Sequence, residues 1–426
     1  MFVPGPKEQL LQRRIFAVLH QRATDEPVVA LHGPRSVGKS TVLAEFAATR
    51  GVAVIDFDDA EIREAAIRNP SLVANGDKPV CIDEYQRAPE ILDALKARLN
   101  KEHAAPGTAV LTGSTRHDAL PRTAQALTGR LHALTLLPLS QGELTGTFEN
   151  FIPGLLADPA AAVAAHPAST TTRDEYITIV TRGGFPLAVN RSDTARQRWF
   201  DDYIRQSIER DAIELSRIRE RQVLRTVLER LAGQTAQLLN VARLGAGIGA
   251  NIKTVESHVR LLEDLFLVQR LDAWGTTLRA RAQRQPKIHV VDAGLAARLL
   301  RLSPAKLARL DPTALTEFGN LLETFVVGEL RKQVSWMDEP VTVGHWRTGN
   351  DEEVDFVIET DDGRVIGFEV KANQTVPGTD LKGLRILRDA LGDRFVAGVA
   401  LSTGSRSYTY EDRIHVCPVD RLWQTV

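Results

Sequence analysis

The stretch GPRSVGKS, from Gly33 to Ser40, decides how the N-terminal third of the chain folds, because it matches the pattern GxxxxGK[ST] in full. An apolar, β-branched run precedes it and a helical pattern follows it, at Val28–His32 and Thr41–Ala48. Glycines let backbone N–H groups curl around phosphates, and a helix N-terminus adds positive potential. We therefore predict a phosphate-binding loop that takes ATP with Gly33, Pro34, Arg35, Ser36, Val37, Gly38, Lys39, Ser40 and Thr41.

The reactive side chains of this site have expected roles. Lys39 would contact the β- and γ-phosphates, and Ser40 would bind Mg²⁺. A second apolar run, Val80–Glu84, ends in two carboxylates. Asp83 could anchor the metal through water, and Glu84 could polarise the attacking water. Alone, this pair would better fit an acidic turn, but together with the phosphate loop it favours a catalytic role.

Two polar features accompany the later strand-like runs. Thr112 or Ser114 could sense the γ-phosphate from a neighbouring strand, although a serine here would equally fit a turn or cap. Arg130 precedes the next run. It could stabilise transition-state charge in its own chain or across a subunit interface, or it could be an ordinary surface arginine.

Composition limits the remaining choices. The chain has 426 residues, enough for roughly three domains. Its 53 basic and 54 acidic residues leave a net charge of −1, which disfavours a globally basic nucleic-acid coat protein. Cys81 and Cys417 allow no disulfide framework and fit a reducing cytosol. The N-terminus lacks an apolar signal segment, and no stretch is apolar enough to span a bilayer, so we expect a cytoplasmic protein without membrane contact.

Strand-like and helical runs alternate in the first third, which is typical of a parallel sheet covered on both faces. The strand-like runs are Val28–His32, Val52–Phe57, Pro79–Asp83, Thr108–Thr112 and Leu131–Leu137. The Ala-, Pro- and Thr-rich tract Pro159–Thr172 is interpreted as a linker or a poorly ordered excursion. We expect an α/β protein with an ATPase domain at 1–145, a linker and helical lid-like region at 146–215, a winged helix-turn-helix domain at 216–312 and a C-terminal α/β domain at 313–426.

The stretch 238–266 has the pattern of a helix-turn-helix. A short helix, Leu238–Gly245, is followed by a glycine-containing turn and a second helix, Asn251–Phe266. In the second helix one stripe is expected to be buried: Val255, Val259, Leu262 and Phe266. The residues expected to face outward are Lys253, Thr254, Glu256, Ser257, His258 and Arg260. The runs Phe266–Ala273 and Lys287–Val291 would supply wing strands.

Charge in this region favours a nucleic-acid partner. Residues 217–290 hold 13 Lys and Arg against 6 Asp and Glu, a local excess of +7 that would support salt-dependent phosphate contact. We expect DNA contacts from Lys253, Arg260, Arg279, Arg281 and Arg284. The alternative is that the winged helix docks on another protein domain, and Glu256 and Glu263 count against a close approach to a DNA groove.

A carboxylate constellation lies in the C-terminal third. Glu369 and Lys371 share one face of a predicted strand, which Asp355 on the preceding strand can reach. Asp355 and Glu369 would bind Mg²⁺, and Lys371 would orient or activate water for attack on a phosphodiester. On the preceding helix Glu323 and Glu329 are six residues apart and do not share a face, so only one is a further ligand, and we assign Glu323. A buried ion-pair network, or an inherited fold without activity, would fit the same residues.

The order of these motifs resembles a widespread prokaryotic group of AAA-type P-loop ATPases fused to a C-terminal domain of unknown function. The resemblance rests on GPRSVGKST, IDEYQRAPEIL, LTGS and LTGRLHALTLLPLSQGEL, and then on Gly183-Gly184-Phe185-Pro186, Glu209-Arg210-Asp211, Lys287–Gly294 and Leu322-Glu323. The C-terminal trio resembles the PD-(D/E)xK nuclease superfamily, in which a helix precedes the metal-binding strands. These resemblances imply a RecA/AAA-like ATPase core and a nuclease-like C-terminal fold.

The favoured hypothesis is an ATPase that binds ATP and Mg²⁺ and couples hydrolysis to DNA processing, with a possible second Mg²⁺ site for cleavage. One alternative is an ATP-dependent switch or scaffold that controls a protein partner. Another is a DNA translocase or remodeller whose nuclease-like fold is silent. Homo-oligomer formation is compatible with each of these hypotheses.

Overall fold

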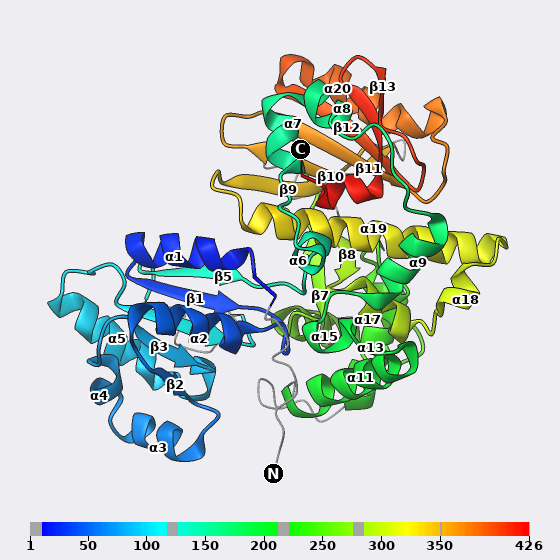
Figure 1. Ribbon diagram of the computed structural model, residues 1–426. Helices are drawn as coiled ribbons and strands as arrows, with labels where there is room; N and C mark the ends of the chain where they lie inside the picture. Colours follow the sequence, from blue (N-terminus) through cyan, green and yellow to red (C-terminus); the bar gives the residue numbers. More distant parts are fainter. Residues whose placement is uncertain (1–10, 117–126, 212–220, 276–284, 350–351, 426) are drawn as a thin grey trace, which may run out of the picture.

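The computed structural model describes residues 11–116, 127–211, 221–275, 285–349 and 352–425. Figure 1 shows an N-terminal sheet in blue and cyan, a C-terminal sheet in orange and red, and green helices beside them. The long helix α19 (Pro312–Ser335) runs along the C-terminal sheet, between that sheet and the green middle helices. No helix within the described ranges is both long and apolar enough to cross a membrane.

The N-terminal sheet is parallel throughout, with strand order β2-β3-β4-β1-β5. Its strands are β1 (Val28–His32), β2 (Val54–Asp56), β3 (Val80–Asp83), β4 (Ala109–Gly113) and β5 (Leu131–Thr135). Its helices are α1 (Ile15–Asp25), α2 (Lys39–Arg50), α3 (Ala60–Arg68), α4 (Pro70–Ala74), η1 (Tyr85–Arg87) and α5 (Glu90–Lys101). Every residue of β1, β3 and β4 is buried, as expected for central strands covered on both faces. The predicted parallel α/β sheet is confirmed.

The middle of the chain is mainly helical and carries a three-stranded antiparallel sheet of order β6-β8-β7. Its strands are β6 (Gln237–Leu238), β7 (Val268–Leu271) and β8 (Lys287–Val290). Its helices are α9 (Arg173–Arg182), α10 (Pro186–Val189), α11 (Asp193–Gln206) with the π-turn η3 (Ser207–Asp211), α13 (Arg221–Ala232), α14 (Val241–Gly245), α15 (Ile252–Asp264), α17 (Ala293–Leu299) and α18 (Pro304–Leu307). The predicted first helix thus begins later than expected, because residues 237–238 pair with β8.

The C-terminal sheet has the order β13-β14-β12-β11-β10-β9. It is formed by β9 (Val341–Arg347), β10 (Glu353–Thr360), β11 (Val365–Lys371), β12 (Phe395–Ser402), β13 (Tyr408–Glu411) and β14 (Ile414–Pro418). The helical pieces are η4 (Gly378–Leu381), α20 (Lys382–Leu391), η5 (Gly392–Arg394) and η6 (Val419–Trp423). β10 and β11 are antiparallel and follow α19, so a helix precedes the two strands that carry the carboxylates, as predicted.

The interpretation of Pro159–Thr172 as a linker is wrong. The segment begins with α8 (Pro159–Ala164), capped by Asp158, and follows α6 (Gln141–Thr145) and α7 (Phe151–Ala157). Its end packs on the C-terminal domain, where Asp420 accepts hydrogen bonds from the hydroxyls of Ser169 and Thr171. Figure 1 shows α7 and α8 against the C-terminal strands. A composition rich in Ala and Pro concealed a short capped helix whose apolar side is buried.

Two glycine motifs form a backbone junction between the middle helices. Gly183 ends α9 with φ +68°, and Gly294 lies in the first turn of α17. A Cβ on Gly294 would lie 2.8 Å from the Gly183 nitrogen. The buried Asp292 caps α17 and also accepts the Gly184 N–H at 2.7 Å. The motifs Gly183-Gly184 and Asp292–Gly294 therefore have a packing role.

We predict that Gly294→Ala lowers the free energy of unfolding by about 1–3 kcal/mol. The added methyl would collide with the backbone of Gly183, and the two helices would have to move apart to make room for it. Chemical denaturation of the full chain measures this. Gly319→Ala is the matched control, since Gly319 is also helical but a Cβ there meets nothing within 4 Å. The control should be stabilised by up to about 1 kcal/mol. Equal midpoints for the two variants would contradict the junction.

Candidate functional site

The phosphate loop connects β1 to α2 and brings the predicted loop residues together. Gly33 has φ +151°, and a Cβ there would lie 2.1 Å from the Leu136 carbonyl oxygen, so only glycine fits. The buried Lys39 folds back, and its Nζ donates to the carbonyl oxygens of Gly33 at 3.0 Å and Pro34 at 2.7 Å. Ser40 and Thr41 are exposed in the first turn of α2. The loop thus presents an amine, two hydroxyls and a helix N-terminus at one place.

The two predicted carboxylates lie at the carboxyl end of β3. The hydroxyl of Thr112, from the adjacent β4, donates to Asp83. Glu84 has φ +52°, a left-handed conformation that is uncommon for a residue other than glycine. Ser114 Oγ donates to Glu84 Oε2 at 3.2 Å, and the Gln86 amide donates to the same oxygen. The left-handed turn therefore brings the Glu84 carboxylate to Ser114, which follows β4, and to Gln86 in η1.

Gln86 is the residue of this group that the sequence interpretation missed. It bridges Glu84 and Ser114, since its Nε2 also lies 3.2 Å from Ser114 Oγ. Its position two residues after a strand-ending carboxylate is a weak signal. The contact depends on the turn at Glu84, which no sequence pattern announces.

Arg130 does not reach the phosphate loop of its own chain. β1 and β5 are parallel and begin side by side at Val28 and Leu131, so Arg130 lies beside the start of β1, whereas the loop follows its end. Five residues at roughly 3.3 Å each place those ends about 15 Å apart. Arg130 Nη1 donates instead to the side-chain oxygen of Asn100 at 2.6 Å. The expectation of a role within the same chain is wrong, and a role across a subunit interface stays a prediction.

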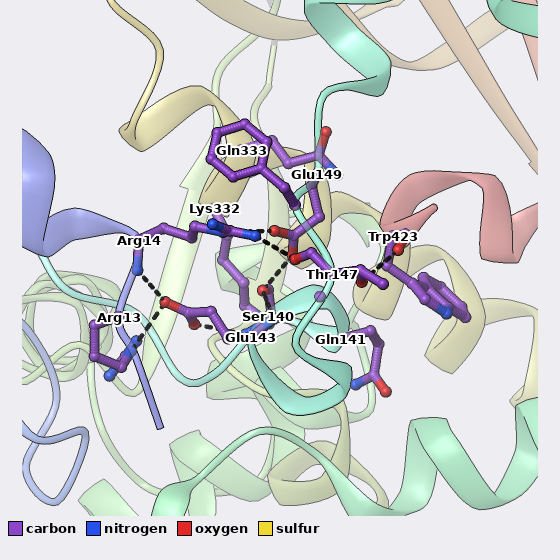
Figure 2. Close-up of polar contacts among 12 residues, drawn as sticks. Arg13, Arg14, Ser140, Gln141, Glu143, Thr147, Glu149, Lys332, Gln333 and Trp423 are labelled. Carbon is purple, nitrogen blue, oxygen red and sulfur yellow. Dashed lines mark hydrogen bonds and ion pairs between the residues drawn. The ribbon is translucent and has the colours of Figure 1, made fainter. Parts of the chain in front are cut away.

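A network of buried charges surrounds the short helix α6, and Figure 2 shows its polar contacts. Arg13 Nε pairs with Glu143 Oε1 at 3.0 Å, and Arg14 Nε pairs with Glu149 Oε2 at 3.2 Å. The side chains of both glutamates are at most 1% exposed. Glu143 also closes a capping box with Ser140, which begins α6. We call Arg13, Arg14, Ser140, Gln141, Glu143, Glu149, Glu329 and Lys332 the α6 network.

The α6 network joins three parts of the molecule. Arg13 also donates to the carbonyl oxygen of Val37 in the phosphate loop. On the opposite side Glu329 Oε2, on α19, accepts the N–H of Gln141 at 2.8 Å, and its Oε1 pairs with Lys332 at 2.6 Å. Burial raises the pKa of Glu329, and Lys332 opposes this effect. Glu329 therefore belongs to this network, not to the carboxylate constellation, in agreement with the expectation that only Glu323 belongs there.

A buried lysine occupies the predicted C-terminal metal site. Lys287, at the start of β8, is 2% exposed, and its Nζ lies 2.7 Å from Asp355 Oδ1 and 2.8 Å from Glu323 Oε1. Although burial alone would lower it, the pKa of Lys287 is raised well above its usual value by Asp355, Glu323 and Glu353. Burial and the Asp355 carboxylate raise the pKa of Glu323 to about 8. Lys287 was expected only to begin a wing strand, and no sequence signal pointed to this contact.

The remaining members of the trio are also engaged. Asp355 Oδ2 accepts the Val370 N–H at 2.9 Å, and Lys371 Nζ pairs with Glu369 Oε1 at 2.8 Å. Among the described residues no group of three or more His, Cys, Asp and Glu side chains is arranged to hold a metal ion. The structure thus brings Glu323, Asp355, Glu369 and Lys371 to one place, as predicted, but as an ion-pair cluster. These contacts match the alternative of a buried ion-pair network, and the Mg²⁺ site stays a prediction.

The second helix of the predicted helix-turn-helix, α15, presents one polar face. Val255, Val259, Leu262 and Phe266 are buried, which confirms the predicted stripe. Lys253 and Arg260 are exposed, but His258 is 3% exposed and does not face outward as expected. Arg230 donates to the carbonyl oxygens of Leu244 and Ala246 and so holds the turn between α14 and α15. Arg279, Arg281 and Arg284 lie outside the described residues.

Three family profiles match successive parts of the chain. The profile described as an AAA domain matches residues 25–145, and two domains of unknown function, DUF8612 and DUF4143, match residues 173–306 and 318–422. Residues 25–145 are therefore an AAA-type P-loop domain, which confirms the resemblance for this part of the chain.

Related proteins and structures cover most of the chain at low identity. The uncharacterized proteins Rv2008c of Mycobacterium tuberculosis and Mb2031c of Mycobacterium bovis are each 26% identical over 98% of this chain and 86% of their own length. Similar solved structures include the Walker-type ATPase PABY2304 of Pyrococcus abyssi, with TM-score 0.39, 13% identity and coverage of 69% of this chain and 97% of that one. The RuvB Holliday junction branch migration motor of Thermotoga maritima has TM-score 0.30, 17% identity and coverage of 63% and 92%.

We predict that Arg14→Met lowers the free energy of unfolding by about 3–5 kcal/mol, because it leaves the fully buried Glu149 carboxylate without its cation. Thermal and chemical unfolding of the full chain measure the loss. Arg205→Met is the control, since Arg205 pairs with Asp202 and each side chain is more than half exposed. That pair should contribute less than about 1 kcal/mol. A loss at Arg14 no larger than the loss at Arg205 would contradict the structural role of the α6 network.

Proposed function

We propose that the chain, whose residues 25–145 are an AAA-type P-loop domain, binds ATP with Mg²⁺ and hydrolyses it at the carboxyl edge of the N-terminal sheet. The observation that carries the proposal is the placement of Lys39 after β1 and of Asp83 and Glu84 at the end of β3, two parallel strands on either side of β4. Phosphoryl transfer needs charge stabilisation and a positioned water more than covalent chemistry. The Lys39 amine can stabilise the charge, and the Asp83 and Glu84 carboxylates can hold the metal ion and position the water.

The contacts of Glu84 support a role as the residue that positions water. Ser114 and Gln86 hold one carboxylate oxygen, which limits the directions in which the other can point. A carboxylate held in this way can accept a proton from water that attacks the γ-phosphate. Ser114 would help to fix the orientation of Glu84, because its hydroxyl donates a hydrogen bond to that carboxylate.

The donor set at the sheet edge also fits Mg²⁺. Ser40 and Asp83 offer hydroxyl and carboxylate oxygens, the ligands that Mg²⁺ prefers. These two residues would hold the ion, which would neutralise charge on the β- and γ-phosphates. Lys39 would bind the same phosphates through its ammonium group.

Arg13 gives the proposed ATPase a physical connection to the other domains. Its guanidinium contacts both the phosphate loop, at Val37, and Glu143 in the α6 network. From there the contacts continue through Gln141 and Glu329 to α19, which lies on the C-terminal sheet. We infer that a shift of the phosphate loop on nucleotide binding would be passed to α19 along these contacts.

The expected outcome of Glu84→Gln is tight ATP binding with a hydrolysis rate lowered by about 100-fold or more, because the amide cannot accept a proton. Lys39→Ala should lose ATP binding itself, since the phosphates lose their cation. Fluorescent-nucleotide binding and phosphate release on purified protein separate the two effects. Glu90→Gln, which changes an exposed glutamate on α5, should leave both properties unchanged. If Glu84→Gln hydrolysed ATP at the wild-type rate, Glu84 would not be the residue that accepts the proton from water.

A second candidate function, DNA binding, rests on the polar face of α15. Lys253 and Arg260 are exposed and seven residues apart, which is about two helical turns and places them on the same face. The surrounding stretch 217–290 carries a local excess of +7. Glu256, also exposed, opposes phosphate contact between them. We propose that this face contacts the DNA backbone more than base edges.

For this candidate we expect the double variant Lys253→Glu, Arg260→Glu to weaken duplex binding and to reduce the slope of log K against log salt by about 2. Fluorescence anisotropy in a salt series gives this slope. The control pair Lys96→Glu, Lys101→Glu reverses two exposed charges on α5, far from α15. An unchanged slope in the α15 variant, or no wild-type binding at low salt, would instead favour docking on a protein.

A further inference from the structure

The C-terminal carboxylate cluster receives its central cation from another domain. Lys287 belongs to β8, the middle strand of the β6-β8-β7 sheet, whereas Glu323 lies on α19 and Asp355 on β10. The Lys287 ammonium lies 2.7 Å from Asp355 Oδ1, 2.8 Å from Glu323 Oε1 and 3.9 Å from Glu353 Oε1. Its side chain is 2% exposed, so these carboxylates replace its water.

These contacts occupy the oxygens that a divalent ion would need. Asp355 has one oxygen on Lys287 and the other on the Val370 N–H. Glu323 Oε1 is on Lys287, and Glu369 Oε1 is on Lys371. Among the oxygens of Asp355, Glu323 and Glu369, Glu369 Oε2 is buried without a hydrogen-bond partner. The Lys287 ammonium already lies between Asp355 and Glu323, so a divalent ion bound there would meet a like charge. The residues present therefore do not fit the metal that the nuclease-like fold implies.

We propose that the Lys287 ammonium takes the place of a divalent cation in this cluster, which acts as a fixed joint between the middle sheet and the C-terminal domain. A lysine carries one charge and three donors on a flexible stem, so it can satisfy Asp355 and Glu323 together. The carboxylates in turn offset the cost of burying the amine. Separation of the two domains would break these ion pairs.

The joint is placed where it resists movement of β8 relative to α19. A second contact in the same region has the same effect, since Thr235, just before β6, shares a hydroxyl hydrogen bond of 2.8 Å with Thr324 on α19. Arg331, further along α19, donates to Gln269 at 3.2 Å and to the carbonyl of Arg270 on β7. The polar contacts thus fasten the middle sheet along one side of α19.

The test compares unfolding temperatures of the full chain, without nucleotide, with and without millimolar Mn²⁺. We expect the wild type to be insensitive to Mn²⁺. Lys287→Met should melt roughly 5–10 °C lower, because the carboxylates lose their cation. Mn²⁺ should restore much of that loss by filling the vacated position. Lys287→Met with Asp355→Asn should lose the response to Mn²⁺, since the ligand nearest the ammonium is gone.

Two further variants keep the test decisive. Lys306→Met removes an exposed lysine that pairs with Glu317 and should melt like the wild type, with or without Mn²⁺. If Lys287→Met does not fold, Lys287→Arg retains the charge and should fold and ignore Mn²⁺. Every variant has the same phosphate loop, so Mn²⁺ bound there would affect all of them equally.

Two results would overturn the proposal. The first is a wild type that Mn²⁺ stabilises, with the stabilisation absent in Glu369→Gln, because the cluster would then accept a metal in the presence of Lys287. The second is a Lys287→Met variant that melts at the wild-type temperature, because the ammonium would then not be needed by its neighbours.

Discussion

The molecule depends most on the constraint that a buried charge must have a partner. In the α6 network Glu143 and Glu149 lose almost all contact with water, and Arg13 and Arg14 supply the compensating charges from the start of the chain. Breaking one member of such a pair costs more than the pair contributes, because the other charge stays buried. The start of α1, the phosphate loop and α19 are therefore held in one arrangement around a helix of five residues.

Lys287 extends the same principle to the C-terminal domain. The AAA-type domain and the C-terminal domain each bring acidic residues together, yet the two clusters have different surroundings. Asp83 and Glu84 are held by hydroxyl and amide groups, which leave their charge uncompensated and available to a cation or a water. Asp355 and Glu323 are held by an ammonium group. The first cluster supports the proposed ATP hydrolysis, and the second supports the proposed joint between domains.

The parts that sequence predicted well are those determined by local pattern. β1 was predicted residue for residue, because its buried residues, four of them apolar, precede a loop in which Gly33 alone fits. The buried stripe of α15 followed from its spacing alone. Arg13, Gln86 and Lys287 could not be found in this way, since each acts on a residue that the fold brings close from a distance or through an unusual turn. The composition of residues 159–172 does not distinguish a linker from a capped helix, because alanine and proline suit both a linker and the first turn of a helix.

The path of the chain through residues 146–172 has a consequence for how the protein can be divided. This segment leaves the N-terminal sheet, packs Phe151, Ile152 and Leu155 into the molecule, and receives a hydrogen bond from Arg421 at the Ala162 carbonyl. A fragment cut before α19 would leave these apolar side chains without the surface that covers them. During synthesis the segment emerges more than 200 residues ahead of Arg421, so it must wait for the end of the chain before it can be buried. The domains follow one another in sequence, but residues 146–172 can be buried only after the C-terminal domain that covers them has been synthesised.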